Sequence, residues 1–248
     1  MLDPLGMALT IQQAIEEMRH ELGGPTHRRL PELEVLNRTG QWLFGARKWR
    51  FLQRPPTSLG VVSGQGYVDL PDDCGTIDKL VVAGRFDLPC HPASQSTVIE
   101  AREQGWTGIF QYAVSWIDAV DEASMARPVL LVAPIPTATS TSFFTLAYTA
   151  DWVDIRDVSK QGTLTGSRGR FPTYMEPLFV EALRAMAAGY ERRSGGSPTE
   201  RLTAIQSGAL WAAAVSRDVR QQRSYGMTIK PVASLSPDWY SGSALPPS

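Results

Sequence analysis

The residue types that most often carry chemistry are few in this chain of 248 residues, and they lack the spacing of a known site. The histidines are His20, His27 and His91, and none has a second histidine four positions away or a carboxylate placed as in a zinc-binding helix. Cys74 and the pair Cys90-His91 have no standard zinc spacing and would need a fourth ligand from elsewhere. We therefore expect no metal site and no cofactor.

Two adjacent carboxylates, Asp72 and Asp73, follow a strand-like segment. They could bind a divalent cation, or act with His91 in a hydrolase, but a solvated turn explains the same residues more simply. The glycine-rich segment 162–169 lacks the Gly-Lys-Ser/Thr ending of a phosphate-binding loop, and the chain has no Gly-x-Ser-x-Gly elbow. We expect no catalytic residue, and the hydrolase ranks as the weakest alternative.

Two short stretches concentrate positive charge. The segment 47–54 interleaves cations with aromatic residues, so it could touch nucleic-acid phosphates, which makes a nucleic-acid-binding module an alternative function. The other interpretation is a helix end whose cations complement the helix dipole while the aromatic residues enter the core. The polar loop near residue 168 is a second candidate for DNA contact. The possible DNA-facing residues are Arg47, Lys48, Arg50, Arg168 and Arg170.

The bulk composition is that of an ordinary globular protein, with 43% apolar and 20% charged residues. The net charge of −1 argues against DNA binding that depends on the overall charge of the molecule. The two cysteines do not make a disulfide scaffold and suit a reducing compartment. No signal peptide is recognised, and no apolar run approaches the ~18 to 20 residues of a membrane helix, so no membrane partner is expected.

Helical periodicity marks both ends of the chain. The predicted helices cover residues 9–22, 31–47, 172–193 and 198–224. Thr10 and Gln13 form a capping-box pattern at the start of the first helix. The last helix would be a single rod ~40 Å long at ~1.5 Å per residue, with Ala209, Ala212 and Ala213 on its apolar face.

The middle of the chain has a period close to two. Short strands are predicted at residues 58–63, 67–70, 77–82, 85–88, 109–117, 129–132 and 143–148, with one short helix at 94–104. This pattern predicts an α+β fold, in which an α-helical bundle carries an inserted antiparallel β-sandwich or barrel. The predicted parts are N-terminal helices at 1–56, the β module at 57–170, a helical hairpin at 171–224 and an extended tail at 225–248.

The tail, residues 225–248, combines prolines that forbid a helix with several large apolar side chains. A merely disordered tail has few aromatic residues, because such side chains seek burial. The tail is therefore predicted to be a docking peptide that orders on a partner. Its candidate docking residues are Val232, Leu235, Trp239, Tyr240 and Leu245.

The order of these parts resembles a known family over about residues 8–224. An amphipathic helix leads to Leu-Phe-Gly-Ala-Arg-Lys-Trp-Arg-Phe-Leu at 43–52, and a strand pair ends in Gly-Tyr-Val-Asp-Leu-Pro-Asp-Asp at 66–73. Phe-Thr-Leu-Ala-Tyr at 144–148 and Phe-Pro at 171–172 then precede the paired helices. The chain is similar to the head-to-tail adaptors of tailed bacteriophages, the tail tubular protein A or gatekeeper proteins of short-tailed phages.

This resemblance implies a structural virion protein rather than an enzyme. It implies a homo-oligomeric ring of 12 copies that lies between the portal protein and the tail tube or nozzle protein. Double-stranded DNA would pass through the channel without sequence-specific contacts during genome ejection. The ring would be assembled in the bacterial host cytoplasm and located at the head–tail interface of the virion, with the tail of each copy reaching onto the portal.

Overall fold

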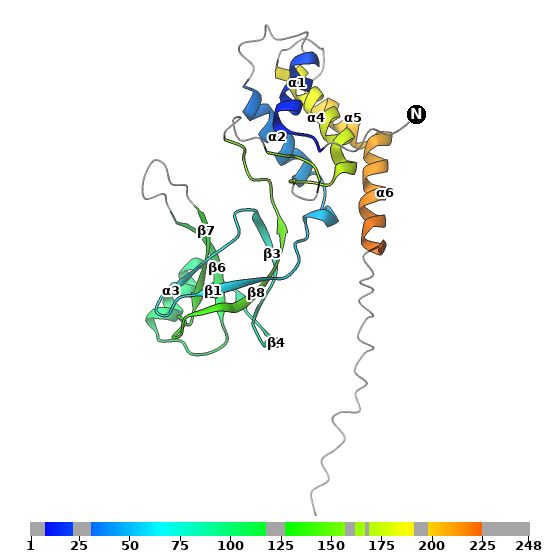
Figure 1. Ribbon diagram of the computed structural model, residues 1–248. Helices are drawn as coiled ribbons and strands as arrows, with labels where there is room; N and C mark the ends of the chain where they lie inside the picture. The colour runs from blue at the N-terminus through cyan, green and yellow to red at the C-terminus, as the bar shows by residue number, and fades with distance from the viewer. Residues whose placement is uncertain are drawn as a thin grey trace, which may run out of the picture.

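The computed structural model describes residues 8–21, 31–117, 127–156, 162–166, 169–190 and 198–224. The helices other than α3 (Gln95–Glu103) gather at one end of the molecule, and two β-sheets with α3 form the other end (Figure 1). The mixed α+β class predicted from the sequence is confirmed.

The helical part combines segments from opposite ends of the sequence. It contains α1 (Ile11–Glu21), α2 (Glu32–Gly45), α4 (Glu176–Tyr190), α5 (Pro198–Gln206) and α6 (Ala209–Ser224). α4 lies at the centre, where it contacts α1, α2, α5 and α6. Its buried residues Leu178, Phe179 and Leu183 belong to the same apolar cluster as Met18 of α1 and Leu43 of α2. Burial against α4 therefore holds the first two helices in place.

The predicted capping box at the start of α1 is confirmed. The backbone N–H of Thr10 donates to Gln13 Oε1 at 2.9 Å, and the N–H of Gln13 donates to Thr10 Oγ1 at 3.1 Å. These two bonds satisfy amides that the first helical turn leaves without partners. α2 begins at Glu32, one residue later than predicted, and Pro31 is its N-cap residue.

The predicted single rod over residues 198–224 is wrong, because the helix breaks at Ser207-Gly208. The N–H of Gly208 turns back to the carbonyl of Ile205 at 3.0 Å, and Ser207 Oγ donates to the carbonyl of Ala204 at 2.8 Å. Glycine costs ~1 kcal/mol in a helix interior, and a serine hydroxyl competes for backbone carbonyls. α6 alone is about 24 Å long at ~1.5 Å per residue.

The third predicted helix also starts later than residue 172. A 3-10 turn, η2 (Thr173–Met175), precedes α4. A similar turn, η1 (Arg50–Leu52), follows α2 after a short extended link.

Within the described residues, the strands form two four-stranded sheets. The first has the order β1 (Thr57–Val61), β8 (Ser140–Ala150), β3 (Cys74–Val82) and β4 (Arg85–Pro89). The second has the order β2 (Tyr67–Asp69), β7 (Arg127–Ala133), β6 (Gln111–Ile117) and β5 (His91–Pro92). Both sheets are open, so among the described residues the barrel alternative is wrong.

One strand pair departs from the predicted antiparallel pattern. β5 was not predicted as a strand, and it pairs in parallel with β6, with His91 opposite Gln111. The cause is α3 (Gln95–Glu103), the predicted short helix, which connects β5 to β6. A helical crossover returns the chain to the same end of the sheet, which makes the next strand parallel. Ser94 caps α3 by accepting from the N–H of Thr97.

An aromatic junction joins the sheets to the helices. The ring centroid of Trp152, which follows β8, lies 5.2 Å from that of Phe44 in α2 and 6.2 Å from that of Phe179 in α4. Gly40 leaves the space for this indole, because a Cβ there would lie 2.2 Å from the Trp152 ring. The buried cluster therefore continues from the helices into the strands.

Candidate interaction surface

α6 packs on the rest of the chain through one face. Trp211, Ala214 and Asp218 point inward and are buried or half-buried, at the i, i+3, i+7 spacing of a single helix face. The residues on the opposite face are exposed: Ala209, Leu210, Ala212, Ala213, Arg217 and Arg220. This outward face of α6 is the surface on which the functional argument rests.

Aromatic rings position the first half of α6. The ring centroid of Trp211 lies 5.0 Å from that of Trp49 and 6.1 Å from that of Trp42 in α2. Trp49 is fully buried, and its Nε1 donates to the Leu43 carbonyl at 2.7 Å. Because both the ring and the N–H of Trp49 have fixed partners, Trp49 gives α6 a well-defined packing surface.

A buried carboxylate holds the second half of α6. Asp218 is only 2% exposed, and it accepts from the backbone N–H groups of Arg50 at 2.9 Å and Phe51 at 3.3 Å. The Tyr174 hydroxyl donates to it at 2.8 Å. Burial raises the pKa of Tyr174, and the hydrogen bond to Asp218 and the charge of Asp218 raise it further. These bonds tie α6 to both η1 and η2.

The basic segment 47–54 lies beside α6. Trp49 enters the core, as the helix-end interpretation predicts, and the Arg47 guanidinium lies 5.7 Å from the centroid of its ring. Lys48 Nζ lies 3.3 Å from Asp78 Oδ1, although its side chain remains 67% exposed. Arg50 is also exposed. Lys48 and Arg50 are therefore accessible, and their contact with DNA stays a prediction.

The other predicted contact residues have different settings. Arg170 is half-buried over the Trp152 ring, with its Cζ 4.8 Å from the centroid, and it donates to the Val153 carbonyl. Burial lowers its pKa, while the nearby charge of Asp154 opposes that shift. Its guanidinium thus serves a contact inside the chain. Arg168 and the tail residues Val232, Leu235, Trp239, Tyr240 and Leu245 lie outside the described residues.

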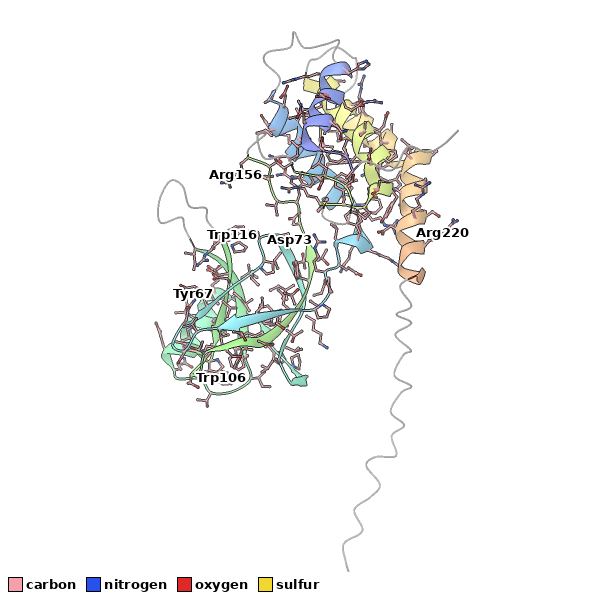
Figure 2. All side chains as sticks on the ribbon, in the orientation of Figure 1. Tyr67, Asp73, Trp106, Trp116, Arg156 and Arg220 are labelled. Carbon is pink, nitrogen blue, oxygen red and sulfur yellow. The ribbon has the colours of Figure 1, made fainter. Side chains whose placement is uncertain are left out.

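The hydrolase constellation is not brought together. Asp73 lies at the junction of the sheets and the helices (Figure 2), where it accepts from Arg54 Nε at 2.9 Å and the Tyr148 hydroxyl at 2.8 Å. Burial and this hydrogen bond raise the pKa of Tyr148. His91 instead lies in β5, at the edge of the second sheet, and Asp72 is exposed in a turn. Asp73 therefore has a structural setting.

The described ranges contain no group of three or more His, Cys, Asp or Glu residues that could hold a metal ion. The cysteines are free thiols, and burial raises the pKa of Cys74 to about 11 and of Cys90 to about 12. Within the part of the chain that the structure describes, no helix has the length and apolarity to span a membrane.

Ala209, Ala212 and Ala213 were predicted to lie on the apolar face of the last helix, and in the structure all three are exposed. The break at Gly208 separates α5 from α6, so the buried face of α6 need not continue the buried face of α5. The face that α6 buries is the one that carries Trp211 and Asp218. The exposed cations Arg217 and Arg220 were missed. Neither forms an ion pair with the described residues. The sequence could have indicated their exposure, because neither arginine lies on the helix face that contains Trp211 and Asp218.

Two further exposed apolar sites lie in the β-sheet part of the molecule. Trp116 and Val114 of β6 are 64% and 45% exposed, and Trp106 and Ile109 are also exposed. Figure 2 shows Trp116 and Trp106 at different ends of the sheets. These side chains are therefore two separate exposed sites.

Comparison with protein-family models and with curated proteins finds no match to this chain.

Proposed function

We propose that this chain is a structural virion protein of a tailed bacteriophage, a ring-forming adaptor that connects the portal to the tail around the DNA channel. In this proposal about 12 copies form the ring, as in the family that the sequence resembles. The proposal includes no reaction and no cofactor. Its sequence basis is the ordered series of motifs over residues 8–224.

The observation that carries the proposal is the setting of α6. Its inward face is held by a buried carboxylate and a tryptophan contact, yet its outward face leaves Ala209, Leu210 and Ala213 in contact with solvent. Small side chains let a neighbouring helix approach closely. Because α6 is held in a fixed position and exposes small apolar side chains, its outward face is suitable for packing against another chain.

The predicted docking tail follows this helix directly. Residues 225–248 continue from Ser224, the last residue of α6, so the tail starts from a point that Asp218 positions. Fully extended, 24 residues reach at most ~80 Å at ~3.3 Å per residue. Trp239 and Tyr240 are the proposed anchors on the portal, because buried aromatic residues dominate the affinity of many interfaces.

The sheets supply the remaining contacts in this proposal. In it they form a sandwich inserted into the bundle, antiparallel except for the β5–β6 pair, with the exposed Trp106 and Trp116 available to a tail component. Lys48 and Arg50 are the proposed contacts to passing DNA. Contacts between a lysine or arginine and phosphate need no base sequence.

Removal of residues 225–248 tests the proposal. The truncated chain is expected to fold, with unchanged circular dichroism, and to fail in joining heads to tails. Electron microscopy of particles from infected cells then shows heads without tails. A matched control lacks only residues 246–248, which leaves every apolar docking residue in place and is expected to join normally. Normal joining by the longer truncation contradicts the proposed role of the tail.

A further inference from the structure

A pocket of ≈ 620 Å³ lies between the two β-sheets, and we call it the inter-sheet pocket. Val82 of β3 and Phe143 of β8 line it from the first sheet, and Phe110, which directly precedes β6, lines it from the second. Figure 2 shows the neighbouring Trp106 at the end of the sheets that lies away from the helical part. The volume falls within the ~300–1,000 Å³ that is usual for small-molecule sites.

One wall of the inter-sheet pocket is built on three phenylalanine rings. The ring centroid of Phe110 lies 5.5 Å from that of Phe143 and 5.3 Å from that of Phe144, in edge-to-face arrangements. Phe144 is fully buried, whereas Phe110 and Phe143 are half-buried. Edge-to-face contacts favour defined orientations of the rings. The pocket therefore presents aromatic surfaces that are held in place before any ligand binds.

A loop that follows α3 forms another wall, and its own contacts hold it in position. The backbone N–H of Trp106 donates to the Ala101 carbonyl at 2.8 Å, and its Nε1 donates to the Ile109 carbonyl at 3.1 Å. The indole packs on Gly108, where a Cβ would lie 2.4 Å from its ring. Thr107, Gly108 and Ile109 line the pocket. A wall that is already formed lowers the cost of binding a ligand.

The described residues that line the inter-sheet pocket carry no charge. Their polar side-chain groups are the Thr107 hydroxyl and the Cys90 thiol. Burial raises the pKa of Cys90 to about 12, so this thiol stays neutral near neutral pH. An ordered water needs ~2–4 polar partners, and an unpaired charge in apolar surroundings is costly. The lining therefore favours an uncharged apolar molecule over an ion.

Large apolar side chains lie next to the pocket on the surface. Ile109 lines it and is exposed. Trp106 and Ile135 are also exposed, and each is the sequence neighbour of a lining residue, Thr107 and Pro134 respectively. Exposed apolar residues that gather around a hollow are typical of a ligand-binding site. These side chains can cover the part of a ligand that reaches the opening.

We propose that the inter-sheet pocket binds a small, uncharged, apolar molecule, which packs against the rings of Phe110 and Phe143 and against the loop 106–109. This site is built from the sheets and from the loop after α3, whereas the proposed adaptor role depends on α6 and the tail. The proposal therefore goes beyond the adaptor role and does not depend on it.

A matched pair of fluorescent probes tests the class of ligand. N-phenyl-1-naphthylamine is uncharged, and 8-anilino-1-naphthalenesulfonate has the same ring system with one added sulfonate. Each probe is titrated into the purified full-length chain, and its emission is followed. The uncharged probe is expected to saturate and to bind at least about tenfold more tightly, because the described lining residues offer the sulfonate no cation. Absence of saturable binding, or binding of the anionic probe with equal or higher affinity, overturns the proposal.

Substitutions in the pocket locate the site. Thr107 is exposed, so Thr107→Trp should occupy part of the pocket without disturbing the core, and it is expected to weaken binding of the uncharged probe at least about tenfold. The matched control Thr203→Trp makes the same change at an exposed position of α5 and is expected to leave the affinity unchanged. Phe143→Leu keeps an apolar side chain but removes one ring, so we expect about threefold weaker binding.

A second control separates this pocket from the other exposed apolar site on the sheets. Val114→Ala/Trp116→Ala truncates two exposed side chains of β6 and is expected to leave binding of the uncharged probe unchanged. Circular dichroism verifies that each variant is folded. Unchanged affinity in both Thr107→Trp and Phe143→Leu, or loss of binding in the β6 variant, places the probe elsewhere and overturns the proposal. The adaptor role stands or falls separately, with the truncation of residues 225–248.

Discussion

The position of α6 depends on Asp218, so replacement of this residue is the most informative perturbation. Asp218→Ala removes a carboxylate that accepts from the N–H groups of Arg50 and Phe51 and from the Tyr174 hydroxyl. All three donors then lose their acceptor. The side chain is 2% exposed, so water cannot replace it without disturbing the packing of α6.

The expected cost is about 3–5 kcal/mol in the free energy of unfolding. A hydrogen bond to a charged group contributes ~1.5–3 kcal/mol, and the three bonds share one acceptor, so their sum is an upper limit. For a chain of this size ~1 kcal/mol shifts the melting temperature by ~2–4 °C, which places the expected fall near 10 °C. Asp218→Asn keeps an acceptor oxygen and is expected to cost about half as much.

Urea unfolding measures the free energy, and near-ultraviolet circular dichroism reports on the helix itself. Trp49 and Trp211 lie 5.0 Å apart in an edge-to-face arrangement, so their coupled signal should fall when α6 loosens. Arg220→Ala is the matched control on the outward face of α6. It is expected to change stability by less than ~0.5 kcal/mol.

Tyr174→Phe isolates one of the three bonds. Alone it should cost ~1.5–3 kcal/mol, and in the Asp218→Ala background much less, because the acceptor is already gone. A loss below about 1 kcal/mol for Asp218→Ala, with an unchanged tryptophan signal, would falsify the assignment of Asp218 as the group that holds α6.

The same pair predicts a sensitivity to alkali. Burial and Asp218 raise the pKa of Tyr174, so the folded chain keeps the phenol proton at a pH where the unfolded chain, with a pKa of about 10, releases it. The folded state then binds more protons, and stability falls as pH rises above ~10. Below that pH the contribution is fully present. Tyr174→Phe should flatten this fall, and an unchanged slope contradicts the argument.

Two further predictions use substitutions or reactions with built-in comparisons. Gly40→Ala should destabilise the chain by ~1–3 kcal/mol in urea unfolding, because its Cβ would overlap the Trp152 ring. Gly45→Ala in the same helix meets open space and should be neutral or stabilising by up to ~1 kcal/mol. Equal effects of the two substitutions refute the packing argument. With iodoacetamide at pH 8, Cys74 and Cys90 should both react more slowly than in the unfolded chain, because burial raises their pKa values to about 11 and about 12, and Cys90 should be the slower because its side chain is buried while that of Cys74 is half-buried. Mass spectrometry follows both thiols, and rates equal to those of the unfolded chain refute the argument.

Local patterns in the sequence were sufficient wherever the determining contacts are close along the chain. The Thr10–Gln13 capping box joins residues three positions apart, and the helix at 94–104 is capped by Ser94 within its own first turn. The α+β class and the places of most strands follow from local periodicity in the same way. Such bonds form between neighbours, so spacing alone reveals them.

Only the tertiary structure decided how α6 is oriented and which carboxylates hold the fold. Alanine is compatible with either burial or exposure, so the alanines of α6 did not reveal the buried face, which depends on Trp211 meeting Trp49. Asp218 and the N–H of Arg50 are 168 positions apart, and Asp73 and Tyr148 are 75 apart. Partners that are distant in sequence meet only when the helices and strands pack, and no local spacing encodes that meeting.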